Sequence, residues 1–143
     1  MNYDNEAILL LNQLQKALRV MVEHMGGCSK GANAILYYLN NIHDGATAGE
    51  LKEHLHIGSG GIANALKDLE EKGYIVRRNG ENDKRVVSVY ITDSGKVLAN
   101  ESYEDTKNNL KLLLETIGEE DSKALIRILD HAIELNENDS FKY

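Results

Sequence analysis

Residues 72–95 read KGYIVRRNGENDKRVVSVYITDSG, and this stretch decides how the rest of the chain is interpreted. Two parts of it, Tyr74–Arg78 and Arg85–Ile91, are rich in the β-branched and aromatic residues that favour strands. Between them lie Asn79-Gly80 and a polar run through Lys84, which is the composition of a loop. The pattern predicts an antiparallel β-hairpin with a charged tip.

The segment before this hairpin predicts two short helices joined by a tight turn. Thr47 and Glu50 are spaced as in a capping box, in which the threonine hydroxyl accepts from the Glu50 amide and the glutamate carboxylate reaches back. The first helix is expected to run from there to Leu55, and after the connector His56-Ile57-Gly58 we expect Ser59 to cap the second. The second helix has a buried stripe at helical spacing: Ile62, Leu66 and Leu69. Two helices joined by a turn containing glycine form a helix-turn-helix, and a hairpin directly after one is a wing.

The remaining segments are amphipathic and free of proline, so they predict long helices. A first helix, capped by Asp4 or Asn5, is expected to end at Gly26-Gly27. It carries a heptad-like seam of Leu11, Leu14, Leu18, Met21 and Met25. Because it is longer than one small domain needs, we expect part of it to meet a partner subunit. A short core helix follows, with the apolar stripe Ala32, Ile35, Leu36, Leu39 and Ile42. After the hairpin we expect a helix from about Lys96 to Ile117 and a last helix after Gly118.

Charge is distributed unevenly along the chain. Between Ala46 and Thr92 there are seven basic and seven acidic residues, whereas the rest of the chain carries the whole net charge of −7. Affinity for nucleic acid depends largely on neutralising phosphates. The central segment is therefore the part of the chain that repels DNA least.

Several classes of protein are disfavoured. The sequence shows no secretory signal pattern and no apolar run of membrane-spanning length, so we expect a cytoplasmic protein without a membrane partner. The single cysteine, Cys28, fits a reducing compartment. The five histidines are scattered and form no recognisable nucleophile and base, so neither an enzyme nor a cofactor is expected.

The hairpin and the helix before it resemble the MarR family of transcriptional regulators. Asp83–Gly95 is similar to that family's D-x-R, alternating strand and L-T-x-x-G. Leu69–Ile75 and Arg77-Arg78 look like the end of its recognition helix and the start of its wing. With the order of the elements, the resemblance covers nearly the whole chain. It implies a homodimer that reads a pseudo-palindromic operator and is usually a repressor, released by a small-molecule, redox or metal signal.

We therefore expect a mainly α fold with a small antiparallel β wing, organised as a single domain over residues 1–143. Residues 32–92 would form the winged helix-turn-helix that binds DNA. Residues 4–27 and 96–137 would form long N- and C-terminal dimerisation helices. The alternative is a winged-helix protein-interaction module without sequence-specific DNA binding, against which the charged D-x-R wing argues.

The wing carries the first candidate DNA contacts. Arg85 is expected to enter a narrow, electronegative minor groove, and Asp83 to hold its guanidinium by a charged hydrogen bond. The alternative is an ordinary solvated charge pair. Further candidate contacts to phosphates are Lys30, Lys52, Arg77 and Lys84.

The recognition helix offers fewer side-chain donors. Its face opposite the buried stripe consists of Gly60, Asn64, Lys67 and Glu71, flanked by Gly61 and Asp68. Asn64 can read adenine, and Lys67 can reach phosphate or guanine. The start Ser59-Gly60-Gly61 could let backbone amides approach a phosphate, or could simply be a flexible turn.

Candidate effector residues lie near the end of the first helix. His24 and Cys28, with Glu23 adjacent and His43 in reach, could bind a thiophilic metal, and Cys28 could instead sense redox state. The family resemblance places a small-molecule cleft at five further residues, although such a stripe is more often core: Arg19, Met21, Met25, Tyr37 and Tyr38.

Overall fold

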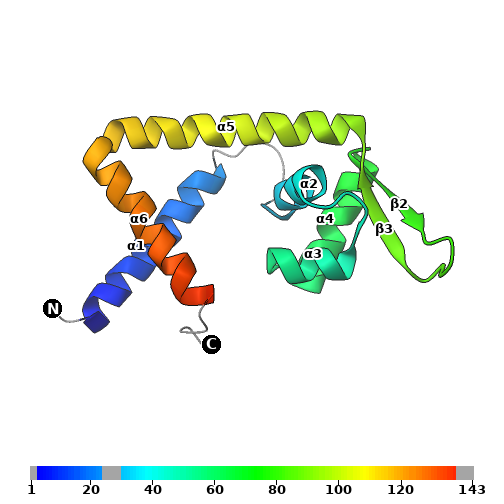
Figure 1. Cartoon of the computed structure of the whole chain (residues 1–143), viewed down its shortest axis with the longest axis horizontal. Helices are drawn as coiled ribbons and strands as arrows, with labels where there is room; N and C mark the ends of the chain where they lie inside the picture. The colour runs from blue at the N-terminus through cyan, green and yellow to red at the C-terminus, as the bar shows by residue number, and fades with distance from the viewer. Residues whose placement is uncertain (1–2, 24–29, 138–143) are drawn as a thin grey trace. The chain divides into compact units, whose positions relative to one another are not determined.

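The computed structural model describes residues 3–23 and 30–137, with side chains placed at 3–17 and 31–135. The elements are, in chain order, α1 (Tyr3–Glu23), α2 (Lys30–Asn41), β1 (Ala46–Thr47), α3 (Ala48–Leu55), α4 (Ser59–Glu71), β2 (Ile75–Asn79), β3 (Val87–Ile91), α5 (Asp93–Ile117) and α6 (Glu119–Glu137) (Figure 1). The expected mainly α fold with a small antiparallel β wing is confirmed.

The chain divides into two compact units, at residues 1–104 and 105–143. Helix α5 begins in the first unit and continues into the second. The first unit contains the helix-turn-helix and the wing. The expected boundaries of a DNA-binding part and of dimerisation helices stay predictions.

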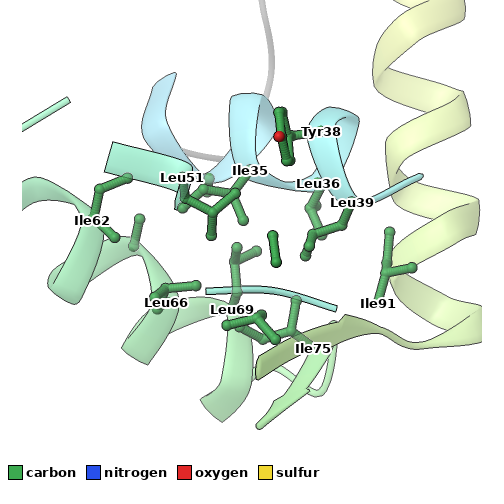
Figure 2. Packing of buried hydrophobic residues seen from close by; sticks show 14 of the residues in the cluster. Ile35, Leu36, Tyr38, Leu39, Leu51, Ile62, Leu66, Leu69, Ile75 and Ile91 are labelled. Carbon is green, nitrogen blue, oxygen red and sulfur yellow. The ribbon is translucent and has the colours of Figure 1, made fainter. Parts of the chain in front are cut away.

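The core of the first unit lies between α2, α3, α4 and the sheet (Figure 2). Its largest fully buried side chains are Ile35, Leu36, Leu39, Leu51, Leu69, Ile75 and Val89. The predicted stripe of α4 is confirmed, because Ile62, Leu66 and Leu69 are all buried. The predicted stripe of α2 is wrong at Ile42, which is exposed because the helix ends at Asn41 and the chain turns away.

The sheet has the strand order β1-β3-β2, with both pairs antiparallel. The two-residue strand β1 was not expected from the sequence, because it lies inside the segment that resembles a helix cap. Strand β3 begins at Val87 rather than at the expected Arg85. Arg85 belongs instead to the wing loop, which is closed by a hydrogen bond from the Gly80 amide to the Val86 carbonyl (2.8 Å).

Thr92 and Gly95 join the end of the wing to the turn after α4. The Thr92 hydroxyl donates to the Gly73 carbonyl (2.7 Å) and accepts from the Gly95 amide (3.1 Å). A Cβ atom on Gly95 would lie 2.2 Å from the Tyr74 carbonyl oxygen and 2.7 Å from a side-chain carbon of Ile91. This contact gives the T-x-x-G motif a steric reason, and α5 begins at Asp93, earlier than expected.

The predicted helix caps are confirmed in part. Thr47 caps α3 and accepts from the Glu50 amide (3.2 Å), as expected. The Glu50 carboxylate reaches back as expected, because a hydrogen bond from the Thr47 backbone helps to lower its pKa; it also accepts from the Tyr38 hydroxyl (2.9 Å) and lies 2.7 Å from Nδ1 of His43. Ser59 is not a cap, because the extended Gly58 precedes the first turn of α4 and its carbonyl accepts the first helical hydrogen bond.

We predict that Gly95→Ala destabilises the fold although alanine is the better helix former. The new methyl group cannot avoid the Tyr74 carbonyl, so the free energy of unfolding should fall by about 1–3 kcal/mol. Urea denaturation at one fixed protein concentration measures this. Gly60→Ala is the matched control, because a Cβ there meets nothing within 4 Å, and it should raise stability by up to about 1 kcal/mol. Equal stabilities of wild type and Gly95→Ala would contradict the steric explanation.

We also predict that Glu50 makes the fold sensitive to acid. The hydrogen bond with His43 is the largest cause that holds the pKa of Glu50 below its ordinary value of 4.5, and the Tyr38 hydroxyl adds to it, while partial burial opposes both. The unfolded chain then binds a proton more readily than the folded one. The stabilisation is thus present above pH 4.5 and is lost as the pH falls through the lower, folded-state pKa.

In Glu50→Gln the free energy of unfolding should depend less on pH in this acidic window. Denaturation at neutral pH and at several acidic pH values measures the slope. If the variant and the wild type lose stability equally with acid, the carboxylate is not responsible.

Candidate nucleic-acid interface

Helix α4 presents one face to the core and leaves the other to solvent. Gly60, Asn64, Lys67 and Glu71 are exposed, as predicted, and lie opposite the buried stripe. The flanking residues are Gly61, which is exposed, and Asp68, which is half-buried. The structure therefore leaves free the face that the sequence assigned to the groove.

The two glycines at the start of α4 have different surroundings. A Cβ on Gly61 would lie 2.8 Å from Cγ2 of Ile57, a residue that packs against the core from the connector. Gly61 is thus explained by packing within the protein. Nothing lies within 4 Å of a Cβ on Gly60. Packing within the protein therefore does not explain Gly60, which leaves two explanations: close approach of an external group, or helix flexibility.

Asp83 and Arg85 form a charged clip at the tip of the wing. The Arg85 guanidinium donates from Nε to Oδ1 and from Nη2 to Oδ2 of Asp83, both at 3.1 Å, and the Arg85 amide donates to Oδ1 at 3.0 Å. The arginine side chain is nevertheless 91% exposed. The guanidinium is held on one edge and open on the other.

The electrostatics of the clip keep it intact at neutral pH. The Arg85 side chain, followed by its amide, lowers the pKa of Asp83 below the ordinary aspartate value. The carboxylate therefore stays ionised well below neutrality. Gly80 supports this geometry, because a Cβ there would lie 2.7 Å from the Asp83 carbonyl oxygen.

The other basic residues of the wing are held by different partners. Arg77 in β2 pairs with Glu70 of α4, with Nε 3.2 Å from Oε2. The Arg78 guanidinium lies over the Tyr90 ring, 5.3 Å from its centre. Lys84, next to the clip, is exposed. Sequence reasoning missed the Glu70 and Tyr90 partners, since neither spacing along the chain nor composition indicates which residue of another element faces an arginine.

Three further cations lie on α3, on α4 and directly after α4. Lys52 is exposed on α3. Lys67 of α4 lies 3.9 Å from Glu71, and Lys72, which follows the last residue of α4, lies 2.9 Å from Asp68. Exposed ion pairs of this kind are weak, so each lysine can exchange its carboxylate partner for another anion.

The effector candidates are described only in part. The side chains of Arg19, Met21, His24, Met25 and Cys28 lie outside the described residues, as does that of Lys30. Tyr37 is exposed and stacks on Tyr103 of α5, with ring centres 6.3 Å apart, whereas Tyr38 is buried in the core. Within the described residues no group of three or more His, Cys, Asp or Glu side chains could hold a metal ion. Nor is any helix in the described parts long and apolar enough to cross a bilayer.

Comparison with known proteins agrees with this geometry. A family model described as a winged helix DNA-binding domain matches residues 33–113. The chain is 28% identical to the uncharacterized HTH-type transcriptional regulator YdgJ of Bacillus subtilis over 131 residues, which cover 90% of this chain and 79% of that protein.

Two solved structures share the fold. A MarR family protein from Bacillus stearothermophilus has a TM-score of 0.73 at 21% identity, covering 94% of this chain and 96% of that one. FabT of Streptococcus pneumoniae, solved in complex with DNA, has a TM-score of 0.74 at 20% identity, covering 96% of this chain and 99% of that one.

The relatives with a named role are transcription regulators and not enzymes, which agrees with the expectation from the scattered histidines. The family model spans more than half of the chain and includes all of α3, α4 and the wing. The protein therefore belongs to the winged-helix DNA-binding domain family, and it shares the fold of MarR family structures.

Proposed function

We propose that the protein binds a pseudo-palindromic operator as a homodimer and represses transcription until a small-molecule, redox or metal signal releases it. The observation that carries the DNA-binding part of this proposal is the clip at the wing tip, in which Arg85 is fixed by Asp83 and yet 91% exposed. A guanidinium held in this way is preorganised to enter a narrow minor groove. FabT, which shares the fold, was solved in complex with DNA, and this supports DNA binding by the present protein.

In this proposal α4 enters the major groove and contributes little hydrogen bonding to bases. Asn64 and Lys67 are the side chains on its free face that can contact base edges. Ser59 and Gly60 bring the first amides of the helix to the surface, where a phosphate can approach. Sequence preference would then depend strongly on the shape of the minor groove at the wing.

Exposed apolar side chains support the homodimer. Helix α1 exposes a run of leucine and isoleucine, and α6 exposes a similar set along its length. These residues are Ile8, Leu9, Leu10, Leu11 and Leu14 in α1, with Ile126, Ile128, Leu129, Ile133 and Leu135 in α6. A monomeric soluble protein rarely exposes so much apolar surface. A second copy, which presents the same surface by symmetry, would cover it.

The proposal is tested by a mobility shift with the DNA upstream of the protein's own gene, combined with a measurement of molar mass. We expect a shift at low salt and the mass of a dimer. A monomer would refute the homodimer. Absence of any shift, with or without cell extract, would favour the alternative of a protein-interaction module.

We predict that Arg85→Ala weakens DNA binding by about 1–3 kcal/mol, because it removes the fixed cation at the wing tip. The slope of log affinity against log salt should become shallower by about 0.9, the value for one phosphate contact. Fluorescence anisotropy with labelled upstream DNA at several salt concentrations measures both. Lys96→Ala, which removes one exposed positive charge from α5, is the control and should change binding little. Unchanged binding by Arg85→Ala would remove the wing from the mechanism.

We predict that Gly60→Ala weakens DNA binding by several-fold although it does not destabilise the protein. The added methyl group has open space in the free protein but would occupy the position of a closely approaching phosphate. The same anisotropy measurement, with denaturation of the same sample, separates the two effects. Affinity equal to that of wild type would show that this glycine serves only the turn.

A further inference from the structure

The basic side chains around the wing and α4 are largely neutralised by the protein itself. Four of them form ion pairs within this part of the described chain: Lys67 with Glu71, Lys72 with Asp68, Arg77 with Glu70, and Arg85 with Asp83. Three of these pairs join residues that are two or four positions apart. Arg77 and Glu70 differ, because they connect strand β2 to helix α4.

The position of Arg77 follows from the register of the wing. Arg77 lies opposite Val89, and Ile75 lies opposite Ile91, so alternate residues of β2 share one face of the hairpin. Ile75, Val89 and Ile91 are buried, which identifies this face as the one directed at the core. Arg77 continues that face beyond the core, where Glu70 of α4 meets it.

This position matters if α4 and the wing enter neighbouring grooves of DNA. Adjacent major and minor grooves are separated by one phosphodiester backbone, so a cation between helix and wing lies where that backbone passes. Glu70 places a negative charge at the same point. Arg77 can then bind a phosphate only by exchanging one anionic partner for another.

We propose that Glu70 is a positioning residue that holds Arg77 against α4 and limits its use as a sequence-independent phosphate contact. This inference rests on the proposed DNA-binding function. Non-specific binding comes almost entirely from cations that neutralise phosphates and release counterions. Because an exposed ion pair is weak, a phosphate placed well by a fitted operator displaces the Glu70 carboxylate. A poorly placed phosphate on other DNA does not.

The test is the salt dependence of binding to a mixed-sequence DNA duplex that contains no part of the upstream region. Glu70→Gln releases Arg77 while keeping the size of the side chain. We expect the slope of log affinity against log salt to become steeper by about 0.9. Between about 50 and 200 mM salt, the affinity of the variant should then fall about threefold more than that of wild type.

Two controls separate this mechanism from a general change of charge. Glu53→Gln removes the same charge from the exposed surface of α3, and no ion pair of Glu53 is found within the described residues; it should leave the slope unchanged. In the background of Arg77→Gln, the further change Glu70→Gln should have no effect on the slope, because the side chain on which it acts is absent.

Three results would overturn the inference: an unchanged or shallower slope in Glu70→Gln, an equal effect of Glu53→Gln, or an undiminished effect in the Arg77→Gln background. A shallower slope would mean that Glu70 instead orients Arg77 toward phosphates. These results leave the proposed function standing if wild type still shifts its upstream DNA. If wild type binds neither DNA even at low salt, the proposed function and this inference fail together.

Discussion

Burial of one stripe of helix α4 is the constraint on which the rest of the first unit depends. Leu66 and Leu69 pack against α2 and the sheet (Figure 2), and a helix with 3.6 residues per turn cannot bury that side without presenting the opposite one. The rotation of α4 about its axis is thereby fixed. Asn64 and Lys67 reach solvent for this reason. The wing is aligned in turn by Ile75, which is buried beside the same helix.

The charges of this unit show how a chain with a net charge of −7 can still contain a DNA-binding surface. Its cations are not concentrated in an unbalanced patch, and most of those on α4 and the wing have an acidic partner in the protein. Such a surface attracts DNA weakly at long range, because the field of each cation is largely cancelled beyond a few ångströms. Short-range geometry then decides binding, and the clip at Arg85 is the part that is geometrically best defined.

Local polar groups followed the sequence rules where no other partner competed for them. Thr47 caps α3, and Asp83 holds Arg85 across two residues, both as expected from spacing. Glu50 completes the capping box, because its carboxylate also interacts with the Thr47 backbone amide. The Tyr38 hydroxyl and the His43 ring, both brought in from α2 and its end, offer its carboxylate two further partners that spacing along the chain does not indicate. The cap of α4 differs from the expectation, because Gly58 takes the cap position in place of Ser59 and the helix starts one residue earlier.

The sequence by itself determined the order and type of most elements, the buried stripe of α4 and the clip at the wing tip. These features depend on periodicity, on the spacing of residues that are close in sequence and on the chemistry of neighbouring residues, and all three follow from the order of residues along the chain. The tertiary structure alone decided which residues from different elements meet: Glu70 with Arg77, Tyr90 with Arg78, and Gly95 with the Tyr74 carbonyl. It also decided that Gly61 is required by packing against Ile57, whereas Gly60 is open. Each of these contacts is set by how two elements dock, and docking depends on the shape of the whole core.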